Sequence, residues 1–287
     1  MPLNLRGIWH YAALLATLGG LAESAESRDI SAQFALTPGD RYVAMGSSFA
    51  AGPGLPPEVA GKSDRCGRSA ANYAHLLARK LQLNLVDMSC GGATTANILA
   101  PWGNLPAQID AVTADTKLVT ITIGGNDVGY IGGLIAETMC KAPGAGTVPC
   151  TQLPPADEHA WEAVEQAMRD VVEGIHRRAP QARVMLVDYL TILPVRGTCE
   201  ALALTASQAD ASRATAVRLA AVTARVAALE NVELLRSSAL SRGHDACSVA
   251  PWTNGLMPQA GLGGVRFHPN QPGMAAIADA LVKRMHG

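Results

Sequence analysis

The feature that most constrains the fold is an alternation, after residue 40, of short apolar runs with longer helix-like stretches. Five runs rich in valine, isoleucine and leucine end in turn residues, at 41–45, 83–88, 118–123, 183–189 and 232–235. Such runs are typical of strands buried on both faces of a parallel sheet. Helical patterns occupy 70–81, 106–111, 157–178, 207–229 and 272–285. The alternation predicts an α/β fold, a three-layer α/β/α sandwich with a central, mostly parallel five-stranded sheet.

Three residues suited to a reactive site follow three of these strands. Ser48 comes after the first predicted strand, Gly92 after the second and Asn126 after the third. In open α/β sheets, ligands bind beyond the carboxyl ends of the strands. We therefore expect the three residues to converge on one edge of the sheet. Three insertions rich in glycine, proline and cysteine are predicted to be loops that frame this edge: 52–68, 129–156 and 190–206.

The first residues resemble an export signal. Arg6 precedes an apolar run from about residue 7 to residue 21, and small residues follow it. A positive start, a short apolar region and small residues are typical of a signal peptide. The run is shorter than the ~20 residues that a membrane-spanning helix needs, although a retained anchor is the alternative. We expect a signal peptide at 1–27, a linker at 28–39, a hydrolase domain at 40–287, and a secreted or periplasmic protein without a stable membrane span after processing.

Composition and charge exclude several other classes. Hydrophobic residues make up 48% of the 287 residues and charged residues 16%, so the chain can bury a large core. The net charge of -1 gives no reason to expect nucleic acid or an anionic membrane as a partner. The sequence has neither a Gly-x-x-x-x-Gly-Lys nucleotide loop nor a His-Glu-x-x-His zinc motif. We expect no cofactor, no metal and a monomer.

Six cysteines lie in the part of the chain expected to be exported: Cys66, Cys90, Cys140, Cys150, Cys199 and Cys247. An even number of cysteines in an oxidising compartment indicates disulfides, although the residues alone leave the pairing open. A zinc site is the competing interpretation. No Cys-x-x-Cys pair occurs in the sequence, which disfavours it.

Ser48 is the candidate nucleophile. A serine hydroxyl attacks an ester only when a base takes its proton, and an imidazole suits this task because its pKa lies near neutral. Two of the seven histidines, His244 and His268, fall in predicted loops, whereas the others lie in the leader, in helical patterns or near the C-terminus. No Gly-x-Ser-x-Gly elbow occurs, which argues against an α/β-hydrolase fold.

Four segments together resemble the ordered blocks of the SGNH hydrolases, also called the GDSL lipase/esterase family: Gly46-Ser47-Ser48-Phe49, Gly91-Gly92-Ala93-Thr94, Gly124-Gly125-Asn126-Asp127 and Phe267-His268-Pro269-Asn270. The resemblance implies that Ser48 is the nucleophile and His268 the base. It also implies an oxyanion hole formed by the backbone N–H groups of Ser48 and Gly92 and the side chain of Asn126. The pattern is closest to that of secreted, disulfide-bonded actinobacterial lipases. That likeness implies the bridges Cys66–Cys90, Cys140–Cys150 and Cys199–Cys247.

Two positions depart from the family pattern. Ser47 stands where members usually carry aspartate, and Val265 stands where most carry the aspartate that orients the catalytic histidine. Some relatives use a backbone carbonyl instead, so we expect the carbonyl of Val265 (or of Arg266) to hold the His268 imidazole. Asp245 is a possible substitute from another loop, although a turn beside a disulfide is its ordinary interpretation. A further segment, residues 252–255, resembles a loop of the same lipases and carries no catalytic prediction.

The sequence therefore predicts an exported serine ester hydrolase that acts on a small-molecule or lipid ester. It would use a Ser-His dyad or a backbone-assisted triad, a Ser/Gly/Asn oxyanion hole and an acyl-enzyme intermediate. The alternatives are a carbohydrate O-deacetylase or a phospholipase A on the same fold. A catalytically inactive binding homologue is the alternative from another class, motivated by the two departures.

Overall fold

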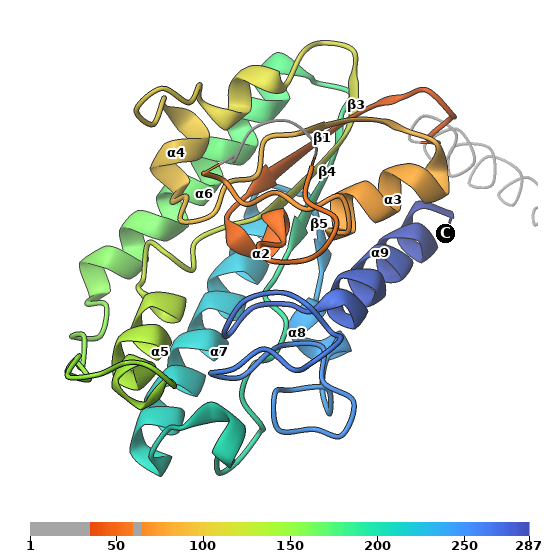
Figure 1. The fold of residues 1–287 in the computed structure, drawn as a ribbon. Coiled ribbons are helices and arrows are strands. Elements are labelled where there is room, and N and C mark those ends of the chain that lie inside the picture. Colours follow the sequence, from red (N-terminus) through yellow and green to blue (C-terminus); the bar gives the residue numbers. More distant parts are fainter. Residues whose placement is uncertain (1–34, 60–64, 287) are drawn as a thin grey trace, which may run out of the picture. The chain divides into compact units, whose positions relative to one another are not determined.

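The core of the computed structural model is a sheet of five parallel strands in the order β2-β1-β3-β4-β5 (Figure 1). The strands are β1 (Arg41–Gly46), β2 (Asn84–Asp87), β3 (Thr116–Thr122), β4 (Arg183–Val187) and β5 (Glu233–Leu235). The neighbouring strands β1 and β3 are almost wholly buried. The structure describes residues 35–59 and 65–286. The predicted α/β class and five-stranded parallel sheet are confirmed, although β4 ends two residues before the predicted limit.

Helices cover both faces of the sheet (Figure 1). On one face, α3 (Tyr73–Leu81) packs against α9 (Gln271–His286). On the other face, α4 (Thr95–Leu99), α6 (Glu158–Arg178) and α7 (Ala206–Leu229) lie side by side. The short helix α2 (Ser48–Ala51) follows β1 directly, so its first residue sits at the carboxyl edge of the sheet. This arrangement is the three-layer sandwich that the alternating pattern predicts.

The helix α6 shows why these segments fold as they do. The side chain of Asp157 caps its start by accepting a hydrogen bond of 2.8 Å from the N–H of Ala160. Arg177 and Arg178 lie in the last turn, where positive charge complements the helix dipole. One stripe of residues at intervals of three and four is buried against the sheet: Trp161, Val164, Met168, Val171, Val172 and Ile175.

The insertion 129–156 is not a loop throughout, contrary to the prediction. It begins with the helix α5 (Tyr130–Thr138), which buries Tyr130, Ile131 and Leu134. The glycine pair 132–133 weakens the helical signal in the sequence, whereas burial of this apolar face stabilises the helix in the fold. The predicted helix at 106–111 is a short 3₁₀ helix, Gln108–Ala111. Two further short helices, α4 and α8 (Ser237–Leu240), have no clear sequence pattern.

Three disulfides tie the connecting segments together: Cys66–Cys90, Cys140–Cys150 and Cys199–Cys247. These are the pairs that the family resemblance implies. The first links the segment before α3 to the end of β2, next to Gly91-Gly92. The third joins the segment after β4 to the segment after α8, across 48 residues. Two of the three bridges therefore hold loops at the carboxyl edge of the sheet.

The elements described here belong to one compact unit that begins at Leu36. The predicted signal peptide, 1–27, and most of the predicted linker, 28–39, lie outside the described residues. Among the helices of residues 35–59 and 65–286, none combines the length and the apolar character needed to cross a lipid bilayer.

Gly46 ends β1 and turns the chain into α2. Its φ of 138° is unfavourable for residues with a side chain. A Cβ built on Gly46 would also collide with the backbone carbonyl oxygen of Thr122 on the neighbouring strand. The close approach lets the N–H of Ser47 donate a 2.9 Å hydrogen bond to that same oxygen. Glycine at this position therefore permits the turn that presents Ser48.

We expect Gly46→Ala to lower the free energy of unfolding by about 3 kcal/mol or more, because it adds a steric clash to backbone strain. Gly39→Ala is the matched control, since Gly39 also has a positive φ of 91° but has open space around it. Gly39→Ala should lower the free energy of unfolding by about 1 kcal/mol. Denaturant unfolding of both variants measures the difference. Equal losses would show that the contact with Thr122 adds nothing.

Candidate active site

Ser48 and His268 meet at the carboxyl edge of the sheet. The hydroxyl oxygen of Ser48 lies 2.7 Å from Nε2 of His268, although 220 residues separate the two in the sequence. Both residues are largely buried, with exposed fractions of 9% and 6%. A serine hydroxyl that donates to an imidazole nitrogen has the geometry of a nucleophile paired with its base. The structure thus brings together the two residues that the sequence selects from opposite ends of the domain.

The other imidazole nitrogen identifies the group that orients the ring. Nδ1 of His268 lies 2.7 Å from the backbone carbonyl oxygen of Arg266. A carbonyl can only accept, so Nδ1 carries the proton and Nε2 is left to accept from Ser48. Of the two carbonyls expected in this role, that of Arg266 makes the contact and that of Val265 does not. The Val265 carbonyl accepts instead from the backbone N–H of His268, at 3.3 Å, and from the side chain of Asn254, at 3.2 Å.

The loop that carries His268 is held by a buried asparagine. Asn254 donates from its side chain to the carbonyl of Gly263 at 2.9 Å, as well as to that of Val265. Its backbone N–H donates to the carbonyl of His268 at 2.9 Å. Phe267 adopts a φ of 55°, which is uncommon for a residue with a side chain, and its complete burial holds it there. Asn254 belongs to segment 252–255, which therefore supports the histidine loop.

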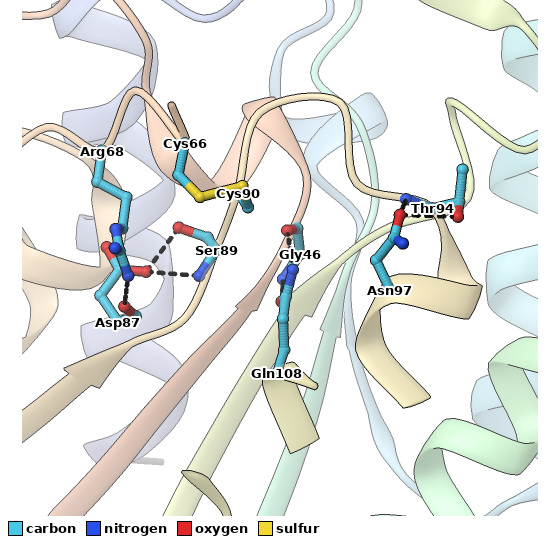
Figure 2. The surroundings of a disulfide bond; sticks show 9 residues. All are labelled: Gly46, Cys66, Arg68, Asp87, Ser89, Cys90, Thr94, Asn97 and Gln108. Carbon is cyan, nitrogen blue, oxygen red and sulfur yellow. Dashed lines mark hydrogen bonds between the residues drawn. A yellow bond between two sulfur atoms is a disulfide. The ribbon is translucent and has the colours of Figure 1, made fainter. Parts of the chain in front are cut away.

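Gly92 lies in the turn that follows β2. Its φ of 82° favours glycine, and a Cβ at this position would lie 3.4 Å from the ring of Trp102. The preceding residue, Gly91, donates its N–H to the carbonyl of Cys66 at 2.8 Å, beside the Cys66–Cys90 disulfide. The bridge and this hydrogen bond together fix the turn. Figure 2 shows the disulfide next to the end of β1.

Asn126 lies in the turn that follows β3. Its side-chain N–H donates to the carbonyl of Ala93 at 2.8 Å, so the third block contacts the second. The next residue, Asp127, accepts hydrogen bonds from the backbone N–H and the hydroxyl of Thr95, at the start of α4. A carboxylate at this position also complements the helix dipole. These contacts place the Asn126 amide beside the Gly92 turn.

The backbone N–H groups of Ser48 and Gly92 are two hydrogen-bond donors at this edge. Within residues 35–59 and 65–286, the N–H groups of Ser48 and Gly92 donate to no backbone carbonyl outside regular helix and strand bonding. Ser48 is also the first residue of α2, where helical N–H groups lack partners within the helix. Backbone N–H groups and a side-chain amide such as that of Asn126 are the types of donor that an anionic oxygen accepts.

Gln108 is a residue of this region that the sequence analysis missed. Its side chain accepts from the N–H of Gly46 at 2.7 Å and donates to the carbonyl of Gly46 at 3.0 Å (Figure 2). Gln108 is only 4% exposed. The double hydrogen bond fixes the backbone just before Ser47-Ser48. In the sequence, only the glutamine beside Ile109 in a short apolar segment could have indicated this role, and such a pattern is weak.

Asp245 and His244, the other loop candidates, do not replace these contacts. Asp245 accepts from the backbone N–H of Cys247 at 2.9 Å, as expected for an aspartate in a turn. The ring of His244 stacks on Trp252 with 4.0 Å between ring centroids, and its Nδ1 lies 2.8 Å from the carbonyl of Ala250. Both residues stabilise the segment beside the Cys199–Cys247 bridge.

A cavity of about 490 Å³ lies beyond Tyr189, and neither Ser48 nor His268 lines it. Its walls are formed mainly by the apolar segment after β4 and by α7, together with the rings of Tyr130 and Tyr189. The ring centroids of Tyr189 and Phe49 are 4.6 Å apart, and those of Phe49 and His268 are 5.2 Å apart. The size and apolar character of this cavity are those of a small-ligand pocket.

Burial keeps the His268 imidazole neutral. Desolvation disfavours the charged form and lowers the pKa of His268 from 6.5 to about 4, and the hydrogen bond to the Arg266 carbonyl only partly offsets this. Between about pH 6.5 and pH 4, the His268 side chain is therefore protonated in the unfolded chain and neutral in the folded protein. This contribution to stability is therefore complete above pH 6.5 and is lost as the pH falls toward 4.

We expect an NMR titration of the His268 ring to give a pKa of about 4. Between pH 6.5 and pH 4, the wild-type protein should lose roughly 3 kcal/mol more unfolding free energy than His268→Gln, because only the histidine binds this proton. Denaturant unfolding at both pH values measures the difference. A ring that titrates near 6.5, or equal losses in the two proteins, would contradict the effect of burial.

Comparison with known proteins agrees with this geometry. Residues 44–276 match the GDSL-like Lipase/Acylhydrolase family. Lipase 2 of Streptomyces coelicolor is 33% identical over 259 residues, which are 85% of each chain. The extracellular lipase of Streptomyces rimosus has a similar fold, with a TM-score of 0.67 and 25% identity over 85% of this chain and 98% of that one. Phospholipase A1 of Streptomyces albidoflavus shares the fold at a TM-score of 0.68 and 24% identity, over 85% of this chain and 99% of that one.

The family match covers most of the chain and includes the Ser48, Gly92, Asn126 and His268 segments. The sequence resemblance and the parallel sheet lead to the same assignment. The chain belongs to the GDSL-like lipase/acylhydrolase family and is a carboxylic ester hydrolase of that family.

Proposed function

We propose that this protein is an exported serine esterase or lipase in which Ser48 and His268 form the catalytic dyad. The observation that carries the proposal is the 2.7 Å contact between the Ser48 hydroxyl and Nε2 of His268. In the first step, Nε2 takes the hydroxyl proton while the Ser48 oxygen attacks the acyl carbonyl. His268 then gives this proton to the departing alcohol, which leaves an acyl-enzyme. Water hydrolyses the acyl-enzyme by the same sequence of proton transfers.

The developing oxyanion would be stabilised by three donors: the N–H groups of Ser48 and Gly92 and the side-chain amide of Asn126. The absence of a backbone acceptor for the first two, within the described residues, supports this role. The Asn126 amide contacts the Ala93 carbonyl in the free protein and would turn toward the substrate oxygen. A donor of this kind contributes on the order of 10²–10³ to kcat.

The Arg266 carbonyl would take the place of the aspartate found in most relatives. Its hydrogen bond to Nδ1 supports the tautomer that a base needs. A neutral carbonyl stabilises the imidazolium less than a carboxylate does, and the lowered pKa of His268 agrees with this. In the proposed enzyme, a backbone carbonyl therefore assists the Ser48–His268 dyad.

Export is supported by two independent features. The three disulfides are typical of proteins that fold in an oxidising compartment. The similar Streptomyces rimosus lipase is described as extracellular. We extend that location to this chain, in agreement with the signal-like pattern of residues 1–27.

We expect a fluorophosphonate probe to label wild-type protein at Ser48, because the paired imidazole activates only this hydroxyl. Ser48→Ala should abolish both labelling and hydrolysis of a short-chain nitrophenyl ester. Ser47→Ala is the matched control, since it removes the neighbouring buried hydroxyl and should still be labelled. Mass spectrometry of the labelled peptide identifies the site. Equal, background hydrolysis by the wild type and Ser48→Ala would support the inactive binding homologue instead.

We propose that the apolar cavity receives the acyl chain, because Tyr189 lines it and the Tyr189 hydroxyl lies 3.4 Å from that of Ser47, next to Ser48. We expect kcat/KM for nitrophenyl octanoate to exceed that for acetate by about tenfold or more, because the longer chain can bury additional methylene groups. Ala220→Phe narrows the α7 wall of the cavity and should reduce octanoate hydrolysis while leaving acetate hydrolysis nearly unchanged. A preference for acetate that Ala220→Phe does not alter would favour the carbohydrate O-deacetylase alternative.

A further inference from the structure

Tyr189 connects two segments of the candidate site from beyond the end of β4. Its hydroxyl oxygen accepts the backbone N–H of Gly125 at 2.9 Å and lies 3.4 Å from the hydroxyl oxygen of Ser47. Ser47 immediately precedes the proposed nucleophile, and Gly125 immediately precedes Asn126. One phenol therefore contacts both the first and the third sequence block.

The roles of the three polar groups follow from their chemistry. The Gly125 N–H can only donate, so the Tyr189 oxygen accepts from it and its O–H remains free to donate to Ser47. Burial raises the pKa of Tyr189 to about 12, so the hydroxyl keeps its proton at neutral pH. The buried Gly125 N–H would have to be satisfied by another acceptor if this oxygen were removed.

The fit between Tyr189 and Gly125 is close. A Cβ on Gly125 would lie 2.7 Å from the Tyr189 hydroxyl oxygen, which is too near for any side chain. The φ of Gly125 does not itself require glycine, since it is not among the glycines with positive φ. The demand for glycine at this position therefore comes from the tyrosine. The two residues are matched in shape as well as in hydrogen bonding.

The Tyr189 ring is linked to the general base through the ring of Phe49. It lies 4.6 Å from the ring of Phe49, and the Phe49 ring lies 5.2 Å from that of His268. Phe49 directly follows Ser48 in α2. The hydroxyl of Tyr189 thus acts on the turn that carries Asn126, while its ring supports the dyad.

We propose that Tyr189 is a positioning residue that holds the Gly125-Asn126 turn against the Ser47-Ser48 turn, so that the Asn126 amide can serve the oxyanion. This inference rests on the proposed function of Ser48, His268 and Asn126. Ser47 occupies the position where the family usually carries an aspartate, and here the phenol supplies an acceptor that links the two turns.

We expect Tyr189→Phe, which removes only the hydroxyl, to lower kcat about tenfold or more while KM changes less than twofold, because the displaced donor acts in the transition state. Tyr42→Phe is the matched control. Tyr42 is another fully buried tyrosine, and its hydroxyl lies 2.6 Å from the hydroxyl of Thr120 within the sheet. That variant should lose comparable thermal stability and keep the wild-type kcat.

A double-mutant cycle with Asn126→Ala tests whether Tyr189 acts through the asparagine. Tyr189→Phe should lower kcat about tenfold in the wild-type background and less than about threefold when Asn126 is already alanine. The same tenfold cost in both backgrounds, or equal losses of kcat in Tyr189→Phe and Tyr42→Phe, would overturn the inference.

A readout without catalysis separates this inference from the proposed function. In two-dimensional NMR spectra, Tyr189→Phe should shift the Gly125 backbone amide and the Asn126 side-chain amide and speed hydrogen exchange at Gly125, whereas Tyr42→Phe should leave both unchanged. Unaltered Gly125 and Asn126 signals in Tyr189→Phe would overturn the positioning role. Failure of fluorophosphonate to label Ser48, by contrast, would count against the proposed function.

Discussion

The hydrogen bond between the Ser48 hydroxyl and Nε2 of His268 is the interaction on which the candidate site depends. It joins a turn after the first strand to a loop near the end of the chain, so each side must be fixed separately. Gly46 and its contacts with Thr122 and Gln108 hold the serine side. Hydrogen bonds to the Arg266 and Gly263 carbonyls, made by His268 and Asn254, hold the histidine side. Neither partner is positioned by local sequence alone.

The turns at this edge are held by contacts that need several distant segments. The Cys66–Cys90 bridge and the Gly91 hydrogen bond fix the second block, and Asp127 ties the third block to α4. Buried polar groups of this kind are costly unless each has a partner. Their mutual hydrogen bonding explains how an irregular polar edge can adjoin an apolar core. Within the described residues, it also leaves the N–H groups of Ser48 and Gly92 without a backbone carbonyl acceptor outside regular helix and strand bonding.

At the two positions where this chain lacks the usual aspartate of the family, another polar group contacts the neighbouring residues. A carbonyl at Arg266 contacts the histidine where most relatives offer a carboxylate, and the Tyr189 phenol lies between the two turns beside Ser47. Both replacements are neutral groups, so neither supplies a negative charge to stabilise an imidazolium. Burial lowers the pKa of His268, and the hydrogen bond to the Arg266 carbonyl offsets only part of this effect. In the proposed mechanism, the base therefore starts as a neutral ring.

The sequence by itself determined the α/β class, the five strands, the ends of the long helices and the placement of Ser48, Gly92 and Asn126 after the first three strands, because hydrophobic periodicity and parallel topology carry this information. Through the family resemblance it also indicated His268 and the three disulfide pairs. Only the tertiary structure decided between the Arg266 and Val265 carbonyls and revealed Gln108 and Tyr189. Carbonyl directions in an irregular loop depend on backbone dihedrals and on competing donors. A buried glutamine or tyrosine, likewise, looks in sequence like any other residue of an apolar segment.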